Sequence, residues 1–217
     1  MLDKVKAIIF DLDGTLIDSM WLWKQIDIDY LAKFNIELPD SLQDEIEGKS
    51  FTETAQFFKE RFQLDDDVEM IKRDWNDMAS IYYMEKVMLK AHVIPFLKHL
   101  KDKGVKMGIA TSNSKVLVTK IVERFNLSVY FESIRTSCEV DKGKPAPDVY
   151  LKVAEDLVVE PKDCLVFEDV INGVLAGQSA GMKVCAVYDE FSRHAKISLE
   201  EMADYYIESF AVVLALA

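Results

Sequence analysis

The sequence predicts an α/β fold in which a doubly wound parallel sheet is interrupted by an inserted all-helical segment. Short apolar runs rich in Val and Ile occur toward both ends of the chain, and helical patterns separate them. Such runs are typical of parallel strands that are buried on both faces. The stretch between about residues 18 and 89 carries helix signals only, and no strand is expected there. Together these observations predict a Rossmann-like core with a helical insertion after its first strand.

The strands of this sheet are expected at the apolar runs that are short and rich in Val and Ile. Each run is followed by a turn or by polar residues, as expected for a strand that ends at the edge of a buried sheet. The expected strands are Val5–Phe10, Val105–Ala110, Cys164–Phe167 and Lys183–Val187.

Helices are expected between these strands. In Lys115–Phe125 the apolar residues form one helical stripe, and Pro147 precedes a second helix, Asp148–Leu157, where a helix start tolerates proline. Gly104 and Gly181 each precede an expected strand, at a position where glycine commonly ends a helix. The alternation of strand and helix therefore continues through the second half of the chain.

The inserted segment has three recognisable helix starts. Ser50–Glu53 has the spacing of a capping box, and Pro39–Ser41 begins another helix. The acidic run Asp65–Asp67 suits the positive end of a helix dipole. We therefore expect the core to comprise residues 1–16 and 89–217, and the helical domain to comprise residues 17–88.

The composition restricts the partners of the protein. The chain has 217 residues and a net charge of −12, which argues against a nucleic-acid partner because phosphate backbones attract basic surfaces. The apolar run at the N-terminus is too short for a signal peptide, and FAVVLALA at the C-terminus is too short to span a bilayer. Three widely spaced cysteines indicate reduced thiols rather than a disulfide or zinc site. We expect a cytoplasmic monomer with no membrane partner.

The first expected strand ends in a pair of carboxylates. The stretch AIIFDLDGTLIDS places Asp11 and Asp13 directly after the apolar run, and Gly14 lets the backbone turn away. Like charges at the end of a strand are costly unless a cation or a shared proton relieves them. Residues two apart in an extended segment point to the same side, so both acids can address one pocket. Ligands of parallel sheets bind beyond the carboxyl ends of the strands, where these acids lie.

A calcium-binding loop and a solvated polar turn are the alternatives for this stretch. An EF-hand loop needs glycine at its sixth position and an acid at its twelfth. Counted from Asp11, the glycine is fourth and the twelfth residue is Leu22, which excludes that loop. A solvated polar turn stays open on this stretch alone. If the pair is a site, one carboxylate can act as a nucleophile while its neighbour carries a proton for the leaving group.

Three later stretches place further polar groups where a phosphate site would need them. IATSNS places Thr111 and Ser112 after a strand, where hydroxyl and helix N–H groups can hold phosphate oxygens. GKPAPD places Lys144 in a turn, as a cation that can balance a nucleophile and a transferring group. VFEDV ends a strand on Glu168 and Asp169, which are hard oxygen ligands suited to Mg²⁺. Each stretch alone could be a helix cap, a surface lysine or an acidic turn, but their occurrence after separate strands indicates one site.

The ordered set DLDGTLIDS, ATSN, GKPAPD and VFED resembles the four signature motifs of the haloacid dehalogenase superfamily of phosphotransferases. The resemblance covers essentially the whole chain. It implies that Asp11 is a nucleophile that forms an aspartyl-phosphate, that Asp13 is the general acid/base and that Lys144 balances charge. It implies Mg²⁺ as the cofactor. The implied phosphate-binding residues are Thr111, Ser112, Asn113 and Lys144, and the implied metal ligands are Asp11, Asp13 through its main-chain oxygen, Glu168 and Asp169.

The helical insertion resembles the small mobile cap of the branch that includes phosphoglucomutases and phosphoglycolate phosphatases. We call residues 17–88 the cap, and we expect hinges near Leu16–Ile17 and Met88–Ala91 because closure would exclude water from the site. Its aromatic residues could alternatively be no more than the core of a small helical bundle. The expected substrate-facing residues of the cap are Trp23, Lys49 and Phe51, with Trp21 as a further candidate.

The resemblance also allows a choice of reaction. An acid at Asp13 implies phosphate-ester chemistry on a leaving alcohol, whereas dehalogenases lack that acid and transport ATPases carry threonine there. β-Phosphoglucomutases carry a histidine at the position of Trp23 and a phosphate-clamping arginine at that of Phe51; Lys49 cannot supply the same planar clamp. We therefore predict a Mg²⁺-dependent phosphatase that acts on a small phosphate monoester such as a sugar phosphate, with β-phosphoglucomutase as the alternative. A phosphorylated receiver domain fits less well because it is shorter and has no helical cap.

Overall fold

A six-stranded sheet forms the centre of the protein in the computed structural model, which describes residues 1–215 apart from the side chain of Asp44. The strand order is β5-β4-β1-β6-β7-β8, and every neighbouring pair in it is parallel. The chain therefore starts at the middle of the sheet, builds one side through β4 and β5, and then returns to build the other side. The strands are β1 (Ala7–Phe10), β4 (Lys106–Thr111), β5 (Ser133–Thr136), β6 (Cys164–Glu168), β7 (Lys183–Val187) and β8 (Tyr205–Ile207).

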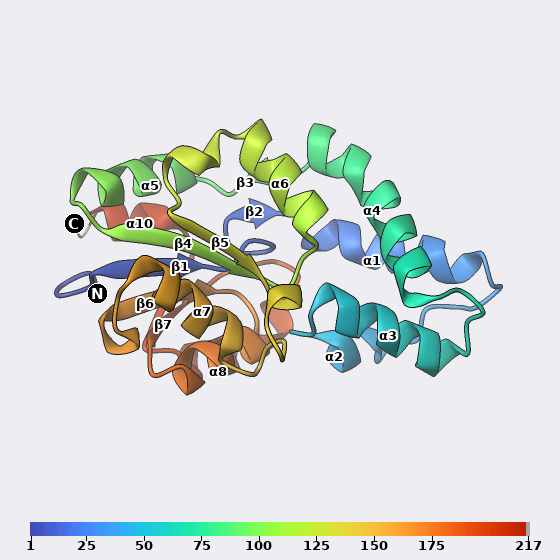
Figure 1. The fold of residues 1–217 in the computed structure, drawn as a ribbon. Coiled ribbons are helices and arrows are strands. Elements are labelled where there is room, and N and C mark those ends of the chain that lie inside the picture. The colour runs from blue at the N-terminus through green and yellow to red at the C-terminus, as the bar shows by residue number, and fades with distance from the viewer. Residues whose placement is uncertain (216–217) are drawn as a thin grey trace.

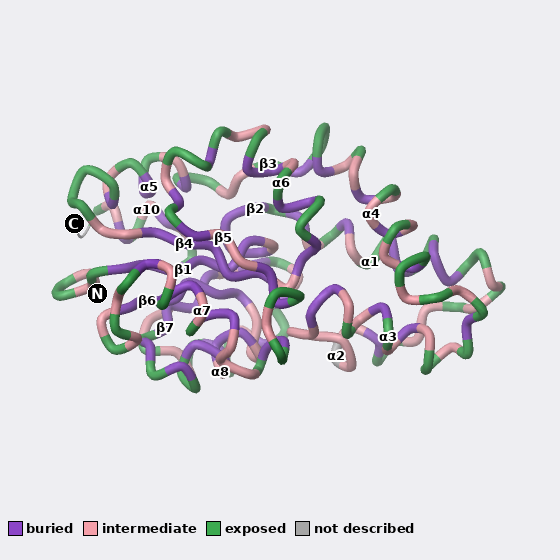
Figure 2. The backbone as a smooth tube through the Cα atoms, viewed as in Figure 1, coloured by how far each residue is buried: buried purple, intermediate pink, exposed green. Residues whose placement is uncertain are grey.

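Helices cover both faces of this sheet, as Figure 1 shows. One group is α5 (Val93–Asp102), α6 (Lys115–Arg124) and α10 (Phe210–Ala215), and the second is α7 (Asp148–Leu157), α8 (Ile171–Ser179) and α9 (Lys196–Met202). Ile8 and Phe10 of β1 pack in the hydrophobic cluster shared with the first group, whereas Ala7 and Ile9 pack in the cluster shared with the second. Alternate side chains of a strand point to opposite faces, so both faces of β1 are apolar and buried. Figure 2 shows this burial along the central strands.

These observations confirm the predicted α/β fold with a doubly wound parallel sheet. Helix α7 has the predicted bounds, and Gly104 and Gly181 follow α5 and α8 with φ of 72° and 75°. The edge strands β5 and β8 were not expected. Short 3₁₀ helices complete the connections of the core: η1 (Leu127–Val129), η2 (Ser137–Glu139), η3 (Pro161–Asp163) and η4 (Arg193–Ala195).

The remaining helices come from residues 20–85 and lie together at the end of the molecule away from both termini (Figure 1). Ser50 and Glu53 form the predicted capping box, and Asp67 caps α4 by accepting a hydrogen bond from the amide of Met70. The assignment of residues 17–88 to a separate domain stays a prediction. The helices are α1 (Met20–Ala32), α2 (Leu42–Ile46), α3 (Phe51–Phe62) and α4 (Val68–Glu85).

The prediction that no strand lies in the inserted segment was wrong at both of its ends. Strand β2 (Ile17–Asp18) pairs antiparallel with β3 (Met88–Leu89), where the chain leaves and re-enters the core. Each strand has two residues, too few for a periodic pattern to reveal. This small sheet joins the two connections that we expect to act as hinges.

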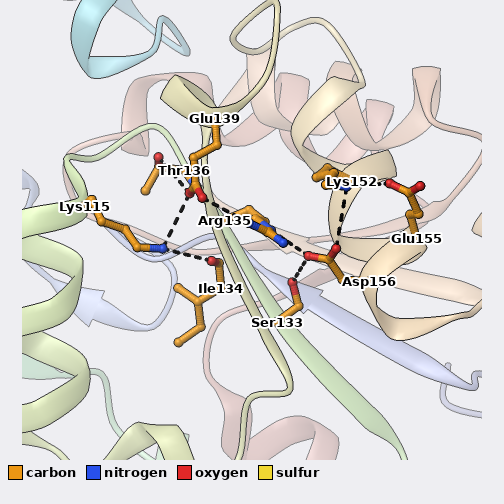
Figure 3. A network of polar contacts seen from close by, with 9 residues as sticks. All are labelled: Lys115, Ser133, Ile134, Arg135, Thr136, Glu139, Lys152, Glu155 and Asp156. Carbon is orange, nitrogen blue, oxygen red and sulfur yellow. Dashed lines mark hydrogen bonds and ion pairs between the residues drawn. The ribbon is translucent and has the colours of Figure 1, made fainter.

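Edge strand β5 carries a network of polar contacts (Figure 3). Arg135 donates a hydrogen bond of 2.6 Å to Asp156 of α7 and pairs with Glu139 at 3.2 Å, and Ser133 also donates to Asp156. Charged side chains on an edge strand disfavour pairing with other chains.

Candidate active site

The polar residues predicted from the sequence line one cavity at the carboxyl ends of β1, β4 and β6. The cavity has a volume of about 190 Å³ and lies where the strand order reverses on either side of β1. Ligands of doubly wound sheets bind at such a switch point. The predicted residues that line it are Asp11, Asp13, Thr111, Ser112, Asn113, Lys144, Glu168, Asp169, Trp23, Lys49 and Phe51.

Lys144 is the buried cation of the cavity floor. Its Nζ donates to Asp11 Oδ1 at 2.7 Å, to Glu168 Oε1 at 2.5 Å and to the carbonyl of Ala110 at 3.2 Å. Tyr150 of α7 donates to the same Glu168 oxygen at 2.8 Å. Lys144 is only 4% exposed, so this arrangement holds a full charge away from water between two carboxylates.

The charges of the floor do not balance. Burial raises the pKa of Asp11 to about 8, although the ion pair with Lys144 works in the opposite direction. Burial, followed by the neighbouring Glu168 and Asp11, raises the pKa of Asp169 well above its usual range. Burial lowers the pKa of Lys144, but Asp11 and Glu168 outweigh it and raise that pKa overall. One ammonium therefore faces three carboxylates, and the excess negative charge favours a further cation.

The carboxylates of the floor suit a divalent metal ion. Oxygen atoms of Asp11, Glu168 and Asp169 all lie within 4.8 Å of one another. Asp169 Oδ1 accepts a hydrogen bond of 2.9 Å from Thr15, but its Oδ2 is buried and has no hydrogen-bond partner among the described residues. A buried carboxylate oxygen without a donor is costly unless a cation binds it. The donor set is all oxygen, which Mg²⁺ prefers.

Gly14 leaves room for the Asp169 carboxylate. A Cβ added to Gly14 would lie 2.1 Å from Asp169 Oδ2, and the φ of Gly14 is 85°. Only glycine adopts this backbone conformation without strain, and any side chain would push Asp169 aside. Gly14 therefore both allows the turn and leaves space for the Asp169 carboxylate.

The pKa of Asp11 predicts how stability depends on pH and metal. The pKa of Asp11 in the folded protein is about 8, above its usual value of 3.8, so between these values the folded protein binds the proton that the unfolded chain has lost. The free energy of unfolding of the metal-free protein should therefore fall as pH rises from about 5 to about 8. Thermal unfolding in chelator and in Mg²⁺ should show a larger gain from Mg²⁺ at about pH 8 than at about pH 6. An equal gain at both pH values, or no gain, would contradict a metal site at this floor.

Asp13 is held by donors from the core and from the cap. Asp13 Oδ1 accepts hydrogen bonds from Ser19 at 2.6 Å, from Trp23 Nε1 at 3.4 Å and from the hydroxyl of Tyr83. Asp13 Oδ2 accepts one of 2.7 Å from Asn113. Trp23 and Tyr83 belong to α1 and α4, so the orientation of Asp13 depends on where these helices lie.

The loop before α3 is bound to the core beside the predicted phosphate site. The hydroxyl of Ser112 donates to the carbonyl of Gly48 at 3.1 Å. The main-chain carbonyl of Ser112 accepts a hydrogen bond of 2.9 Å from the amide of Phe51. The amide of Gly143, next to Lys144, donates to Glu53 at 3.3 Å. In this conformation the hydroxyl of Ser112 therefore donates its hydrogen bond to the cap.

Thr111 and Asn113 lie at the end of β4. Thr111 is buried, and its hydroxyl accepts a hydrogen bond of 3.1 Å from the amide of Asn113. The side chain of Asn113 donates to Asp13 and to Tyr83, and its Oδ1 accepts from the amide of Ser114. Phosphate binding by Thr111, Ser112 and Asn113 stays a prediction.

The aromatic candidates of the cap differ in their placement. Trp23 and Phe51 line the cavity with ring centroids 6.0 Å apart. Trp21 does not line it: its side chain is exposed and packs edge-on against Tyr82. The expectation that Trp21 lies near the cleft was therefore wrong, because its ring packs against Tyr82 of α4 instead.

The sequence patterns did not identify several residues of the site. Tyr83 lies 70 residues from Asp13 along the chain and resembles an ordinary apolar position of an amphipathic helix. Tyr150 likewise belongs to the buried face of α7. Ser19 stands inside the motif DLDGTLIDS and could have been noticed there as a hydroxyl donor. Further lining residues, for which the sequence predicts no role, include Asp27, Gln43, Trp75, Phe191, Ser192 and His194.

Comparison with known proteins agrees with this geometry. The family of haloacid dehalogenase-like hydrolases matches residues 8–187. The bifunctional riboflavin kinase/FMN phosphatase of Arabidopsis thaliana is 34% identical over 83% of this chain, and the chain spans about half (48%) of that protein. The probable pseudouridine-5′-phosphatase of Drosophila melanogaster is 32% identical over 98% of this chain and 96% of its own length. The crystal structure of β-phosphoglucomutase from Clostridium difficile has a similar fold, with a TM-score of 0.82 at 20% identity over 97% of this chain and 96% of that one.

Proposed function

Because the chain belongs to the haloacid dehalogenase-like hydrolase family, we propose that it is a Mg²⁺-dependent phosphatase of small phosphate monoesters. The observation that carries this proposal is the placement of Asp11, paired with Lys144, in the same cavity as Asp13 and the carboxylates that could hold a metal ion. Relatives that are phosphatases by name support the hydrolase assignment.

The first step transfers the phosphoryl group to Asp11. Asp11 Oδ1 is held by Lys144, whereas Oδ2 accepts no hydrogen bond from the described residues and can attack phosphorus. As the Asp11–phosphorus bond forms, the bond to the ester oxygen breaks and Asp13 gives that oxygen its proton. The leaving group departs as a neutral alcohol, and the enzyme holds an aspartyl-phosphate.

The second step hydrolyses the aspartyl-phosphate. Asp13, now ionised, takes a proton from water as the water oxygen attacks phosphorus, and the bond to Asp11 breaks to release phosphate. The positive charge of Lys144 offsets the charge of Asp11 and of the phosphoryl oxygens throughout. A Mg²⁺ ion held by Asp11, Asp169, Glu168 and the main-chain oxygen of Asp13 would add positive charge that offsets phosphate repulsion.

The position of the cap would control when Asp13 can act. Its carboxylate accepts hydrogen bonds from Trp23 and Tyr83, and it must be released from one of these donors to reach the ester oxygen. We propose that movement of the cap about β2 and β3 makes this change and that closure excludes water during the first step. A small phosphorylated metabolite as substrate, a monomeric state and a cytoplasmic location belong to the same proposal. Among residues 1–215, no helix combines the length and apolar character that crossing a bilayer requires.

Two side chains favour hydrolysis over a mutase reaction. Trp23 makes a hydrogen bond to Asp13, but an indole N–H does not release its proton as a histidine does. Phe51 is uncharged, and the nearby Lys49 lies 5.8 Å over the ring of Phe57. A mutase must retain a bisphosphate intermediate, which a cavity without an arginine clamp holds poorly.

A product assay tests the proposal. With β-glucose 1-phosphate and a bisphosphate activator, the protein should release inorganic phosphate in Mg²⁺ and release none in excess chelator. Stoichiometric glucose 6-phosphate without inorganic phosphate would establish the mutase instead. Full activity in chelator would refute the metal requirement.

A further inference from the structure

The cap side of the cavity combines aromatic rings with a few buried polar groups. Phe51 lies between Trp23 and Trp75, with centroid distances of 6.0 and 5.5 Å. Asp27 of α1 and Gln43 of α2 line the same cavity. Binding sites for small molecules typically have such apolar walls with a small number of placed polar groups.

Asp27 is a buried carboxyl group without a cation. Asp27 is 5% exposed, and Gln43 Nε2 donates to its Oδ2 at 2.8 Å. Oδ1 accepts no hydrogen bond from the described residues, and no ion pair to Asp27 occurs among them. Burial raises the pKa of Asp27 to about 7, with the hydrogen bond from Gln43 opposing that change. The Oδ1 atom of Asp27 can therefore still accept hydrogen bonds from a ligand.

Trp75 is a second buried polar group without a partner. Trp75 lines the cavity and is 2% exposed, and its indole N–H meets no acceptor in the described part of the chain. Buried donors in folded proteins are nearly always satisfied, so an orphan donor in a cavity wall indicates an acceptor that a ligand brings. Asp27 and Trp75 are thus independent observations on the same wall.

This wall fits one kind of leaving group. When it is ionised, the Asp27 carboxylate opposes a second anion in the substrate, and the cation that the cap places on the cavity, Lys49, lies over the ring of Phe57 instead. Hydroxyl groups can both donate to Asp27 and accept from Trp75. Aromatic rings pack against the carbon skeleton of an alcohol that carries those hydroxyls.

We propose that Asp27, Gln43 and Trp75 form a subsite that binds hydroxyl groups of the leaving alcohol and selects monophosphates of neutral, polyhydroxylated alcohols. This inference rests on the phosphatase function proposed for the cavity. We call it the hydroxyl subsite.

Three substrates, two pairs of variants and the further variant Asp27→Asn test the hydroxyl subsite. The substrates are sorbitol 6-phosphate, phenyl phosphate and phosphoglycolate. Phenyl phosphate has no hydroxyl group besides its ester oxygen, and phosphoglycolate carries a second anion. Asp27→Leu removes the hydrogen-bonding group, and its control is Asp29→Asn on the exposed face of the same helix. Trp75→Phe removes the N–H and keeps an aromatic ring, and its control is the exposed Trp21→Phe.

The subsite predicts selective losses. Asp27→Leu should lower kcat/KM for sorbitol 6-phosphate by about 30-fold or more, and Trp75→Phe by about 10-fold, mainly through KM. Phenyl phosphate turnover should change by less than about threefold in both, and the controls should match the wild type for every substrate. At about pH 8, where the Asp27 carboxyl group is mostly ionised in the wild type, Asp27→Asn should improve phosphoglycolate turnover relative to sorbitol 6-phosphate turnover, since it removes the repelling charge.

The outcomes separate this inference from the function on which it rests. Equal losses for sorbitol 6-phosphate and phenyl phosphate would assign Asp27 and Trp75 a merely structural role, and unchanged sorbitol 6-phosphate turnover would also overturn the subsite. In both cases the phosphatase would stand. A wild-type protein that releases phosphate from none of the three substrates would instead refute the phosphatase. If Asp27→Leu does not fold, Trp75→Phe and Asp27→Asn decide the question.

Discussion

Asp11→Asn is expected to abolish phosphate release, with a loss in kcat of at least about 10⁴-fold. An asparagine amide does not attack phosphorus, so the aspartyl-phosphate cannot form. The variant should still fold, because asparagine has the size of aspartate and its oxygen can accept the hydrogen bond that Lys144 donates to Asp11 Oδ1. It should also be more stable than the metal-free wild type near pH 8, since it lacks the carboxyl group whose pKa burial raises.

Asp18→Asn is the matched control for this variant. Asp18 belongs to the same motif, but its side chain is exposed and does not line the cavity. Steady-state phosphate release should fall in Asp11→Asn and stay within about twofold of the wild type in Asp18→Asn. Retention of more than about one hundredth of the wild-type rate by purified Asp11→Asn would exclude Asp11 as the nucleophile.

Lys144→Met should damage both stability and catalysis. Lys144 is buried between Asp11 and Glu168, and methionine fills a similar volume without charge. Two buried carboxylates would lose their cation, which costs roughly 3–5 kcal/mol when one partner of a buried pair is removed. The loss of positive charge next to the transferring group should lower kcat by about 10²–10³-fold.

The control for Lys144→Met is Lys142→Met, two residues earlier in the same loop, where the side chain is exposed. The urea midpoint and kcat should both fall in Lys144→Met and stay unchanged in Lys142→Met. A Lys144→Met protein of normal stability and activity would show that the ion pairs with Asp11 and Glu168 are dispensable. Added Mg²⁺ should restore part of the stability, because it supplies positive charge to the same carboxylates.

The sequence was sufficient to predict the sheet centre and the floor of the site. A buried strand can be recognised from its apolar residues, and Asp11, Thr111 and Glu168 stand at or just beyond the ends of such runs. Parallel strands bring their carboxyl ends to one edge, so the clustering of these residues follows from the fold. The two-residue strands β2 and β3 and the half-buried edge strands β5 and β8 have no such signal.

The walls of the site could not be predicted in the same way. Tyr83 of α4 reaches Asp13 only in the folded protein, and Asp27 of α1 is buried where Gln43 of α2 contacts it. Both residues occupy ordinary helix positions in the sequence. Which side chains face a cavity depends on how helices pack, and periodicity alone does not fix that packing.

A covalent bond between Asp11 and phosphate is the central claim of the proposed mechanism, and trapping that bond tests it most directly. The protein should be mixed with a phosphate monoester and Mg²⁺, quenched, and treated with borohydride, which reduces an aspartyl-phosphate to homoserine. Peptide mass spectrometry should then find homoserine at position 11 in the wild type and none at this position in Asp11→Asn. Phosphate release at the full rate with position 11 unmodified, or with the modification on Asp13 or Asp169 instead, would contradict the mechanism.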